Sequence, residues 1–276
     1  MLAWVCASGT MTLSSYSYRR SATALLSGAA DALASVFFPA SCGICEKLLL
    51  RANRVPICEE CLASFTPIPQ RACEICGQPI ESFYTEAEVG LHCPNCAPPR
   101  YAFARARSMA IYEDALVSAV LMLKYRRMDP LAKWFAQCLA LLVRGQGDAY
   151  LADIVVPVPL HRDRLKERGF NQAALLARAL AKALKLPSNL NLLVRTRERP
   201  QKQVLSIEER WEAVRGAFAT RPGSQVDKLR VLLVDDVLTT GATLDACARA
   251  LLDSGAKSVV AVTIARAARS PVTGPQ

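Results

Sequence analysis

Two adjacent carboxylates followed by a threonine-rich turn are the residues of this sequence best suited to chemistry. Asp235 and Asp236 end the apolar run VLLVDD, and the stretch LTTGAT comes two residues later. Like charges this close repel, and buried carboxylates are costly unless something binds them. Hydroxyls and backbone amides at the start of a helix form a cradle for phosphate. Because paired carboxylates also accept hydrogen bonds from vicinal hydroxyls, the stretch predicts a site for a ribose 5-phosphate.

Eight of the 11 cysteines form four C-x-x-C pairs, which is the ligand spacing of structural zinc sites. Two such pairs supply four thiolates to one tetrahedral ion, so four pairs predict two closed zinc sites without a catalytic water. Consecutive and interleaved pairing are both compatible with the spacing. His92 abuts one pair, but four thiolates already complete each site, and we expect it to be a bystander. The predicted ligands are Cys42, Cys45, Cys58, Cys61, Cys73, Cys76, Cys93 and Cys96.

Charge and cysteine usage restrict the class of protein. The 276 residues carry 34 basic and 24 acidic side chains, and this net charge of +10 indicates an anionic partner, either nucleic acid or a phosphorylated small molecule. The odd number of cysteines and the lack of a convincing export signal favour a reducing compartment, so we expect a cytoplasmic protein without a membrane span. Residues 21–38 predict an amphipathic helix, with a signal peptide as the competing interpretation.

The elements that must position these groups are read from the apolar pattern. Residues 39–100 hold all four cysteine pairs and no long periodic apolar run, so something other than an apolar core must hold this region together. After about residue 101, continuous apolar strands alternate with helical patterns, which predicts a mostly parallel sheet covered by helices. Ligands of such sheets bind at the carboxyl ends of strands, where the aspartate pair lies. We expect helices at 113–127, 129–144, 171–184 and 243–255, strands at 153–160, 190–195, 229–236 and 257–266, and a loop at 195–210.

The stretch VLLVDDVLTTGAT resembles the phosphoribosyl-pyrophosphate (PRPP) loop of type I phosphoribosyltransferases. Together with the cysteine pairs, FFPASCGIC, MLKYRR and LHRDRLKERGFNQAALLARALA, it makes the chain similar to the ComF family from about residue 30 onward. These proteins join a double zinc ribbon to a phosphoribosyltransferase domain and are associated with DNA uptake and natural transformation. The resemblance implies an α/β fold with a type I phosphoribosyltransferase-like parallel sheet flanked by helices. The implied parts are an N-terminal extension with the amphipathic helix (1–35), a double zinc ribbon (36–100) and a phosphoribosyltransferase-like domain (101–276).

The same resemblance implies roles for particular residues. Asp235 and Asp236 would be the catalytic pair that holds the ribose hydroxyls of PRPP, which binds with Mg²⁺, while the two zinc ions are structural. A basic run would form a positive wall for the pyrophosphate; a solvated loop is the other interpretation of this run. The remaining PRPP-binding positions are Thr239, Thr240, Gly241, Ala242 and Thr243 at the phosphate and Arg162, Arg164 and Arg168 in the basic run.

The sequence does not identify the acceptor of the ribosyl group. Arg199, Lys202 and Ala213 stand where the resemblance leads us to expect Thr, Gln and Asn, and Thr239 disfavours hypoxanthine-guanine salvage because threonine is no acid at neutral pH. Two hypotheses stay open. The chain is an enzyme that transfers ribosyl 5-phosphate and releases pyrophosphate, or it is a non-catalytic PRPP-binding module that binds single-stranded DNA or a protein of the DNA uptake machinery. The basic residues proposed for DNA are Arg126, Arg127, Arg195, Arg197, Arg199 and Lys202.

Overall fold

The computed structural model describes residues 4–7, 10–13, 40–49, 55–80, 91–96, 100–197 and 206–267. The amphipathic helix expected at 21–38 lies outside these residues, as do Arg199 and Lys202. In the described part of the chain, no helix has both the length and the apolar character needed to cross a membrane.

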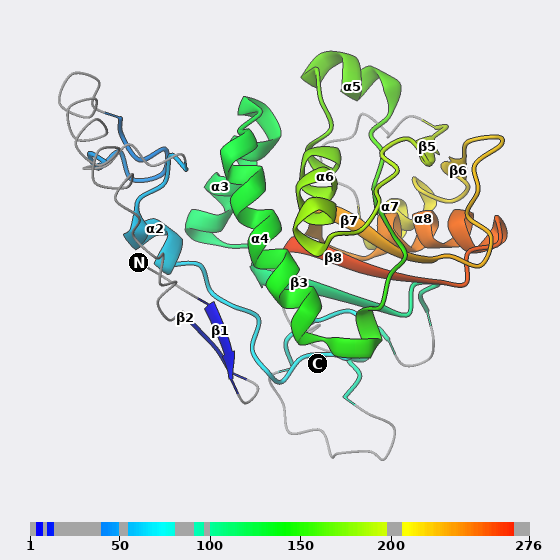
Figure 1. Cartoon of the computed structure of the whole chain (residues 1–276), viewed down its shortest axis with the longest axis horizontal. Helices are drawn as coiled ribbons and strands as arrows, with labels where there is room; N and C mark the ends of the chain where they lie inside the picture. Colours follow the sequence, from blue (N-terminus) through cyan, green and yellow to red (C-terminus); the bar gives the residue numbers. More distant parts are fainter. Residues whose placement is uncertain are drawn as a thin grey trace.

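A four-stranded parallel sheet forms the centre of the larger part of the molecule (Figure 1). Its strand order is β3 (Arg105–Ile111), β8 (Ser258–Arg266), β7 (Arg230–Leu238) and β4 (Ile154–Pro157). Each neighbouring pair is parallel, which confirms the predicted parallel sheet. Strand β3 was not predicted, because two arginines interrupt its apolar pattern.

Helices cover both faces of this sheet (Figure 1), which is why its central strands read as continuous apolar runs. Leu232 and Val234 of β7 pack in the core formed with α3 (Asp114–Arg126), α4 (Asp129–Gly145) and α6 (Gln172–Leu184). The alternate residues Val231 and Leu233 pack on α8 (Ala242–Asp253). The N-cap of α4 is Met128, and Asp129 occupies the first turn of the helix.

The loop expected at 195–210 is partly wrong, because its last residues begin a helix. The hydroxyl of Ser206 accepts the backbone N–H of Glu209 at 3.1 Å, and the Glu209 carboxylate accepts that of Ser206 at 2.7 Å. This capping box has the sequence signature S-x-x-E, which is typical of the start of a helix. The shorter elements are β1 (Trp4–Ala7), β2 (Thr10–Leu13), α2 (Glu59–Ala63), η1 (Gly147–Tyr150), α5 (Arg162–Arg168), β5 (Leu193–Arg195), α7 (Ile207–Glu212) and β6 (Phe218–Thr220).

The cysteine-rich region packs directly against the sheet and its helices. At the edge strand β3, the N–H of Ala106 donates to Ile75 O at 2.7 Å, and Arg107 donates to Glu74 O at 2.8 Å. Closer to the N-terminus, Phe65 makes ring contacts with Trp134 and Phe135 of α4. The two regions therefore share buried contacts at two separate places.

Candidate functional site

The aspartate pair lies near the carboxyl end of β7, at the edge of the sheet where the turn to α8 begins. Strand β7 continues two residues beyond the pair to Leu238, and Asp235 pairs with Thr263 of β8. The turn ends at Gly241, the N-cap of α8, whose φ of 82° lies in the left-handed region that favours glycine. The structure therefore places the predicted strand, turn and helix in the predicted order, with the helix beginning at Ala242.

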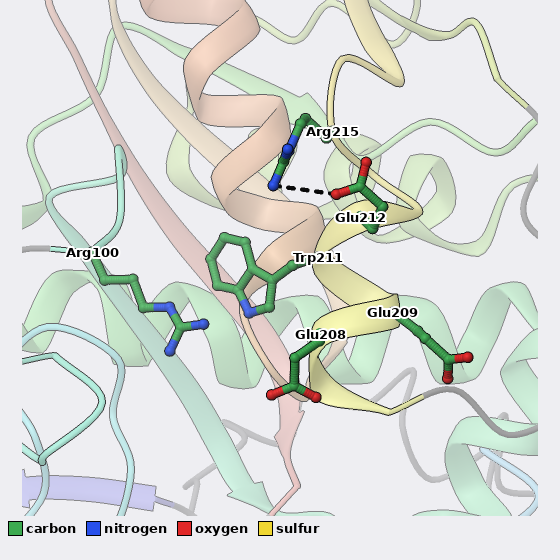
Figure 2. A pocket seen from close by; sticks show the side chains of 6 residues that line it. All are labelled: Arg100, Glu208, Glu209, Trp211, Glu212 and Arg215. Atoms are coloured by element: carbon green, nitrogen blue, oxygen red, sulfur yellow. Dashed lines mark ion pairs between the residues drawn. The ribbon is translucent and has the colours of Figure 1, made fainter.

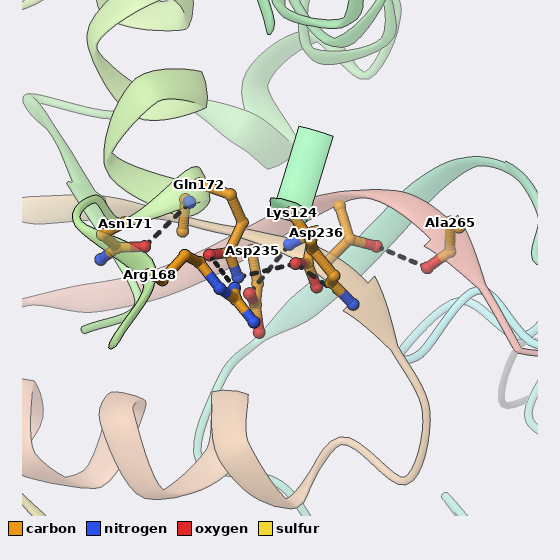
Figure 3. A network of polar contacts seen from close by, with 9 residues as sticks. Lys124, Arg168, Asn171, Gln172, Asp235, Asp236 and Ala265 are labelled. Atoms are coloured by element: carbon orange, nitrogen blue, oxygen red, sulfur yellow. Dashed lines mark hydrogen bonds and ion pairs between the residues drawn. The ribbon is translucent and has the colours of Figure 1, made fainter. Parts of the chain in front are cut away.

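Asp236 is buried and has partners from two other elements (Figure 3). The side-chain amide of Gln172 donates to Asp236 Oδ2 at 2.7 Å, and Lys124 Nζ lies 3.4 Å from the same oxygen. Arg168 in turn donates to Gln172 Oε1 at 2.6 Å. Two cationic groups are thus held close to the aspartate pair, one in direct contact and one through an amide.

Asp235 has a different environment from its neighbour. It is half-buried, and its Oδ1 accepts the backbone N–H of Asp236 at 2.8 Å. Burial, together with the charge of Asp236, raises the pKa of Asp235 to about 8. This environment favours the protonated form of Asp235, and a cation or another ligand would favour its charged form.

The turn after β7 presents the groups of a phosphate cradle. Thr240 is buried, and its hydroxyl accepts the backbone N–H of Ala242 at 3.3 Å, while Tyr101 Oη donates to Thr240 O at 2.8 Å. A small cavity of about 20 Å³ lies in the turn, which is room for about one water or one phosphate oxygen. Its lining consists of Asp235, Val237, Leu238, Thr239, Gly241, Thr243 and Leu244.

Among the residues described, only one arginine of the basic run at 162–168 connects to the aspartate pair. The run forms the short exposed helix α5, on which Arg164 lies 3.8 Å from Glu167. In the described part of the chain, neither Arg162 nor Arg164 contacts the aspartate pair, and only Arg168 reaches it through Gln172. Asn171 caps α6, since its Oδ1 accepts the N–H of Ala173 at 2.9 Å.

Sequence reasoning missed four side chains that contact the site. Lys124 and Gln172 bind Asp236, Tyr101 binds the turn, and Arg266 donates to the carbonyls of Leu238 and Thr239. Lys124 had a signal, because the run MLKYRR places it directly after the apolar residues of α3, in the last turn of the helix. The others lie far from the turn in sequence, and only the folded structure brings them to it.

The eight paired cysteines form two clusters, and the pairing is consecutive. Within each cluster all sulfur atoms lie within 4.8 Å of one another, and His92 belongs to neither. A tetrahedral zinc with Zn–S bonds of about 2.3 Å needs sulfur–sulfur distances of about 3.8 Å. The observed values of 3.6 Å between Cys45 and Cys58 and 3.7 Å between Cys76 and Cys93 fit such an ion. The first cluster is Cys42, Cys45, Cys58 and Cys61, and the second cluster is Cys73, Cys76, Cys93 and Cys96.

A larger cavity of about 450 Å³ lies beside α7 (Figure 2). Three glutamates line it, and one of them, Glu212, pairs with Arg215 at 3.2 Å. Because three carboxylates repel a pyrophosphate, we do not assign PRPP to this cavity. Its lining is Arg100, Glu208, Glu209, Trp211, Glu212 and Arg215.

Comparison with known proteins agrees with this organisation. Residues 171–272 match the phosphoribosyl transferase domain model, and residues 33–97 match the double zinc ribbon domain model. The DNA utilization protein YhgH of Salmonella typhimurium is 31% identical over 80% of this chain and 94% of that protein. Competence protein F of Haemophilus influenzae is 28% identical over 76% of this chain and 90% of that protein. Competence protein ComFC of Bacillus subtilis is 29% identical over 76% of this chain and 84% of that protein.

Solved structures give distant matches. Glutamine PRPP amidotransferase from B. subtilis is 23% identical over 52% of this chain and 30% of that chain, with a TM-score of 0.35. Adenine phosphoribosyltransferase from Leishmania donovani is 22% identical over 49% of this chain and 52% of that chain, with a TM-score of 0.31. Similarity at this level does not bear on the site or its ligand.

The sheet, the turn after β7 and the two cysteine clusters define a protein in which a double zinc ribbon is joined to a type I phosphoribosyltransferase domain. The chain belongs to the ComF family.

Proposed function

We propose that the chain binds PRPP with Mg²⁺ at the end of β7 and transfers its ribosyl 5-phosphate to an acceptor, releasing pyrophosphate. One arrangement carries the proposal: two adjacent carboxylates on a parallel strand are followed by a threonine turn that opens a helix. Asp235 has the unfavourable environment that a ligand would relieve, since its pKa is raised and its carboxyl group has one hydrogen bond in the described chain, which it accepts from a backbone amide. The turn offers hydroxyls and amides to the phosphate.

The roles of the side chains follow from their environments. Asp235 would accept hydrogen bonds from the ribose hydroxyls, and Asp236, fixed by Gln172, would support it. Lys124 and Arg168 would supply positive charge near the pyrophosphate. Mg²⁺ bound with the substrate would neutralise charge on the departing pyrophosphate. No covalent nucleophile is needed, because positioning and charge stabilisation suffice for a carbocation-like transition state.

Membership of the ComF family supports a cellular role for this activity. The names of the relatives, competence protein and DNA utilization protein, support a role in handling incoming DNA. A cytoplasmic location agrees with eight cysteines held as metal ligands. We place the ribbon at 36–100 and the phosphoribosyltransferase-like domain at 101–276, since β3 already belongs to the parallel sheet.

A binding role for single-stranded DNA is the second candidate, and an exposed aromatic residue favours it. Tyr125 is 67% exposed at the end of α3, next to the exposed Arg126 and Arg127. The Arg168 guanidinium lies 5.2 Å from the centre of the Tyr125 ring. An exposed ring among arginines is a stacking platform for a base, and such binding weakens steeply with salt. If Tyr125→Ala and wild type bind an oligonucleotide equally at low salt, this platform is not used.

Isothermal titration calorimetry with PRPP tests the main proposal. We expect binding that requires Mg²⁺ and is abolished by Asp235→Asn, whereas Asp227→Asn, an exposed carboxylate before β7, binds as wild type does. Pyrophosphate release is then measured with bases, amines and oligonucleotides as acceptors. Release of pyrophosphate with one acceptor supports transfer, and PRPP binding without release for any acceptor supports the non-catalytic module. If Asp235→Asn binds PRPP as tightly as wild type does, the proposed site is wrong.

A further inference from the structure

Arg266 connects the second cysteine cluster with the phosphate turn. It is the last residue of β8 and is only 2% exposed. One of its terminal nitrogens donates to Leu238 O at 3.0 Å and to Thr239 O, and the other lies 3.7 Å from Cys76 Sγ. One guanidinium thus joins a metal ligand to the two carbonyls from which the turn starts.

The charge of Arg266 is balanced by the cluster and not by a carboxylate. In the described chain Arg266 makes no ion pair with Asp or Glu, and its Nε has no hydrogen-bond partner. A buried cation without a counter-charge is strongly destabilising. Four thiolates around Zn²⁺ carry a net charge of −2, so the loaded cluster supplies the missing negative charge.

Tyr101 makes a second connection between the same two features. Its ring packs against the second cluster, and its hydroxyl donates to Thr240 O at 2.8 Å. A Cβ added to Gly241 would lie 2.7 Å from Tyr101 Cε1, so the ring also contacts the last residue of the turn. Arg266 and Tyr101 together contact every residue from Leu238 to Gly241.

Among the described residues, the first cluster has no such connection. Its residues Cys42 and Cys58 belong to the core formed with α3 and α4, and Gly43 lies against Met122 of α3. In the described part of the chain, none of its sulfur atoms contacts the turn after β7. The two clusters therefore offer a matched comparison within one chain.

We propose that Arg266 is a positioning residue through which metal in the second cluster sets the conformation of the phosphate turn. PRPP affinity then depends on metal in the second cluster and not on metal in the first, a consequence that rests on the proposed PRPP site. By linkage, PRPP must in turn stabilise metal in the second cluster.

Hydrogen exchange of the full-length protein tests the connection without PRPP. We compare wild type with Cys96→Ser, which removes a ligand of the second cluster but leaves Cys76, and with Cys45→Ser, which removes an exposed ligand of the first. Amides 239–243 should exchange faster in Cys96→Ser and at the wild-type rate in Cys45→Ser. Arg266→Lys keeps the charge but cannot span both carbonyls and the sulfur, so it should retain both zinc ions and still exchange faster at the turn. Amides of α4 serve as the internal reference for global unfolding.

Titration with PRPP then completes the test. Cys96→Ser and Arg266→Lys should bind PRPP about fivefold to a hundredfold more weakly than wild type, the range of typical coupling between sites. PRPP should also slow the release of zinc from the second cluster to a chelator. Equal exchange at the turn in wild type and Arg266→Lys, with both metals present, overturns the proposal. If exchange changes as expected but no variant or wild type binds PRPP, the proposed function fails and the connection stands.

Discussion

The side-chain amide of Gln172 donates a 2.7 Å hydrogen bond to Asp236, although 64 residues separate them. This contact joins the first turn of α6 to the end of β7, and Lys124 reaches the same carboxylate oxygen from α3. The two adjacent aspartates are therefore not equivalent. Asp236 is fixed by contacts with Gln172 and Lys124, whereas Asp235 faces the turn, and the pKa of Asp235 is raised by burial and by its neighbour.

Replacement of each aspartate by asparagine should separate stability from binding. Asp236→Asn leaves Lys124 without its carboxylate, so the free energy of unfolding should fall by about 1–3 kcal/mol. Asp235→Asn removes a carboxyl whose raised pKa lowers the stability of wild type at pH 7, so this variant should be at least as stable as wild type there. Urea denaturation measures both variants, and a larger loss in Asp235→Asn than in Asp236→Asn would contradict the assignment.

The raised pKa of Asp235 also predicts how the free energy of unfolding depends on pH. The pKa of Asp235 is about 8 in the folded chain, above its ordinary value of 3.8, so the folded state holds a proton that the unfolded state has lost between these values. The free energy of unfolding of wild type should therefore fall, relative to that of Asp235→Asn, as pH rises from about 4 to about 8. Denaturation curves at pH 5, 7 and 9 give this difference. A difference that is independent of pH would mean that Asp235 has an ordinary pKa.

Asp153 should show the opposite dependence. It accepts two hydrogen bonds from the Arg230 side chain, at 2.6 and 3.0 Å, and one from its backbone N–H, and these contacts lower its pKa to about 2. Asp153→Asn should therefore be less stable than wild type at neutral pH. The difference should persist down to about pH 4 and disappear as pH falls toward 2, where the wild-type carboxyl is protonated too. Thermal unfolding across this range checks it, and a difference unchanged at pH 2 would show that charge is not its cause.

The parts of the site that could be predicted from the sequence are those formed by residues that are neighbours in the chain. Apolar residues, two acids, hydroxyls and a glycine follow one another from 231 to 243, so strand, turn and helix could be read together. Cysteine spacing gave the metal ligands for the same reason, although it left the pairing open. Local physics is sufficient where a function is built from one continuous segment.

The contacts that come from distant segments could not be predicted. Arg266 reaches the turn only because β8 pairs with β7 in parallel, with Arg266 opposite Leu238. The basic run at 162–168 has the composition of an anion-binding wall, but its helix exposes most of its side chains, and composition does not reveal where a helix points. Strand β3 was hidden because Arg105 and Arg107 use their side chains at the ribbon contact, which removes the apolar signal.

Metal analysis should find about two zinc ions per chain, because each cluster offers four thiolates at tetrahedral spacing. Cys45→Ser and Cys96→Ser should each retain about one ion, since consecutive pairing makes the clusters independent. Inductively coupled plasma mass spectrometry after dialysis against a weak chelator gives the counts. A loss of both ions from either variant would indicate that the two sites are linked, and a count near zero in wild type would contradict the ribbon.

Gly241→Ala should deform the turn without altering charge. Its φ of 82° strains any other residue by about 1–2 kcal/mol, and the added methyl would lie 2.7 Å from Tyr101 Cε1. The Tyr101 ring has little room to retreat, because it stacks on Phe103 at 4.6 Å and on Trp211 at 5.8 Å. The turn must therefore shift, so PRPP affinity and stability should both fall.

Gly223→Ala is the matched control for this change. Its φ of 77° imposes similar backbone strain, but no atom lies within 4 Å of the added methyl. We expect urea denaturation to show the larger loss for Gly241→Ala, by about 1–3 kcal/mol beyond that of the control, because overpacking adds to the strain. PRPP titration should show wild-type affinity for the control alone. Equal stability losses, with PRPP affinity unchanged in both variants, would mean that the turn adapts to the methyl and that its contact with Tyr101 does not shape the phosphate site.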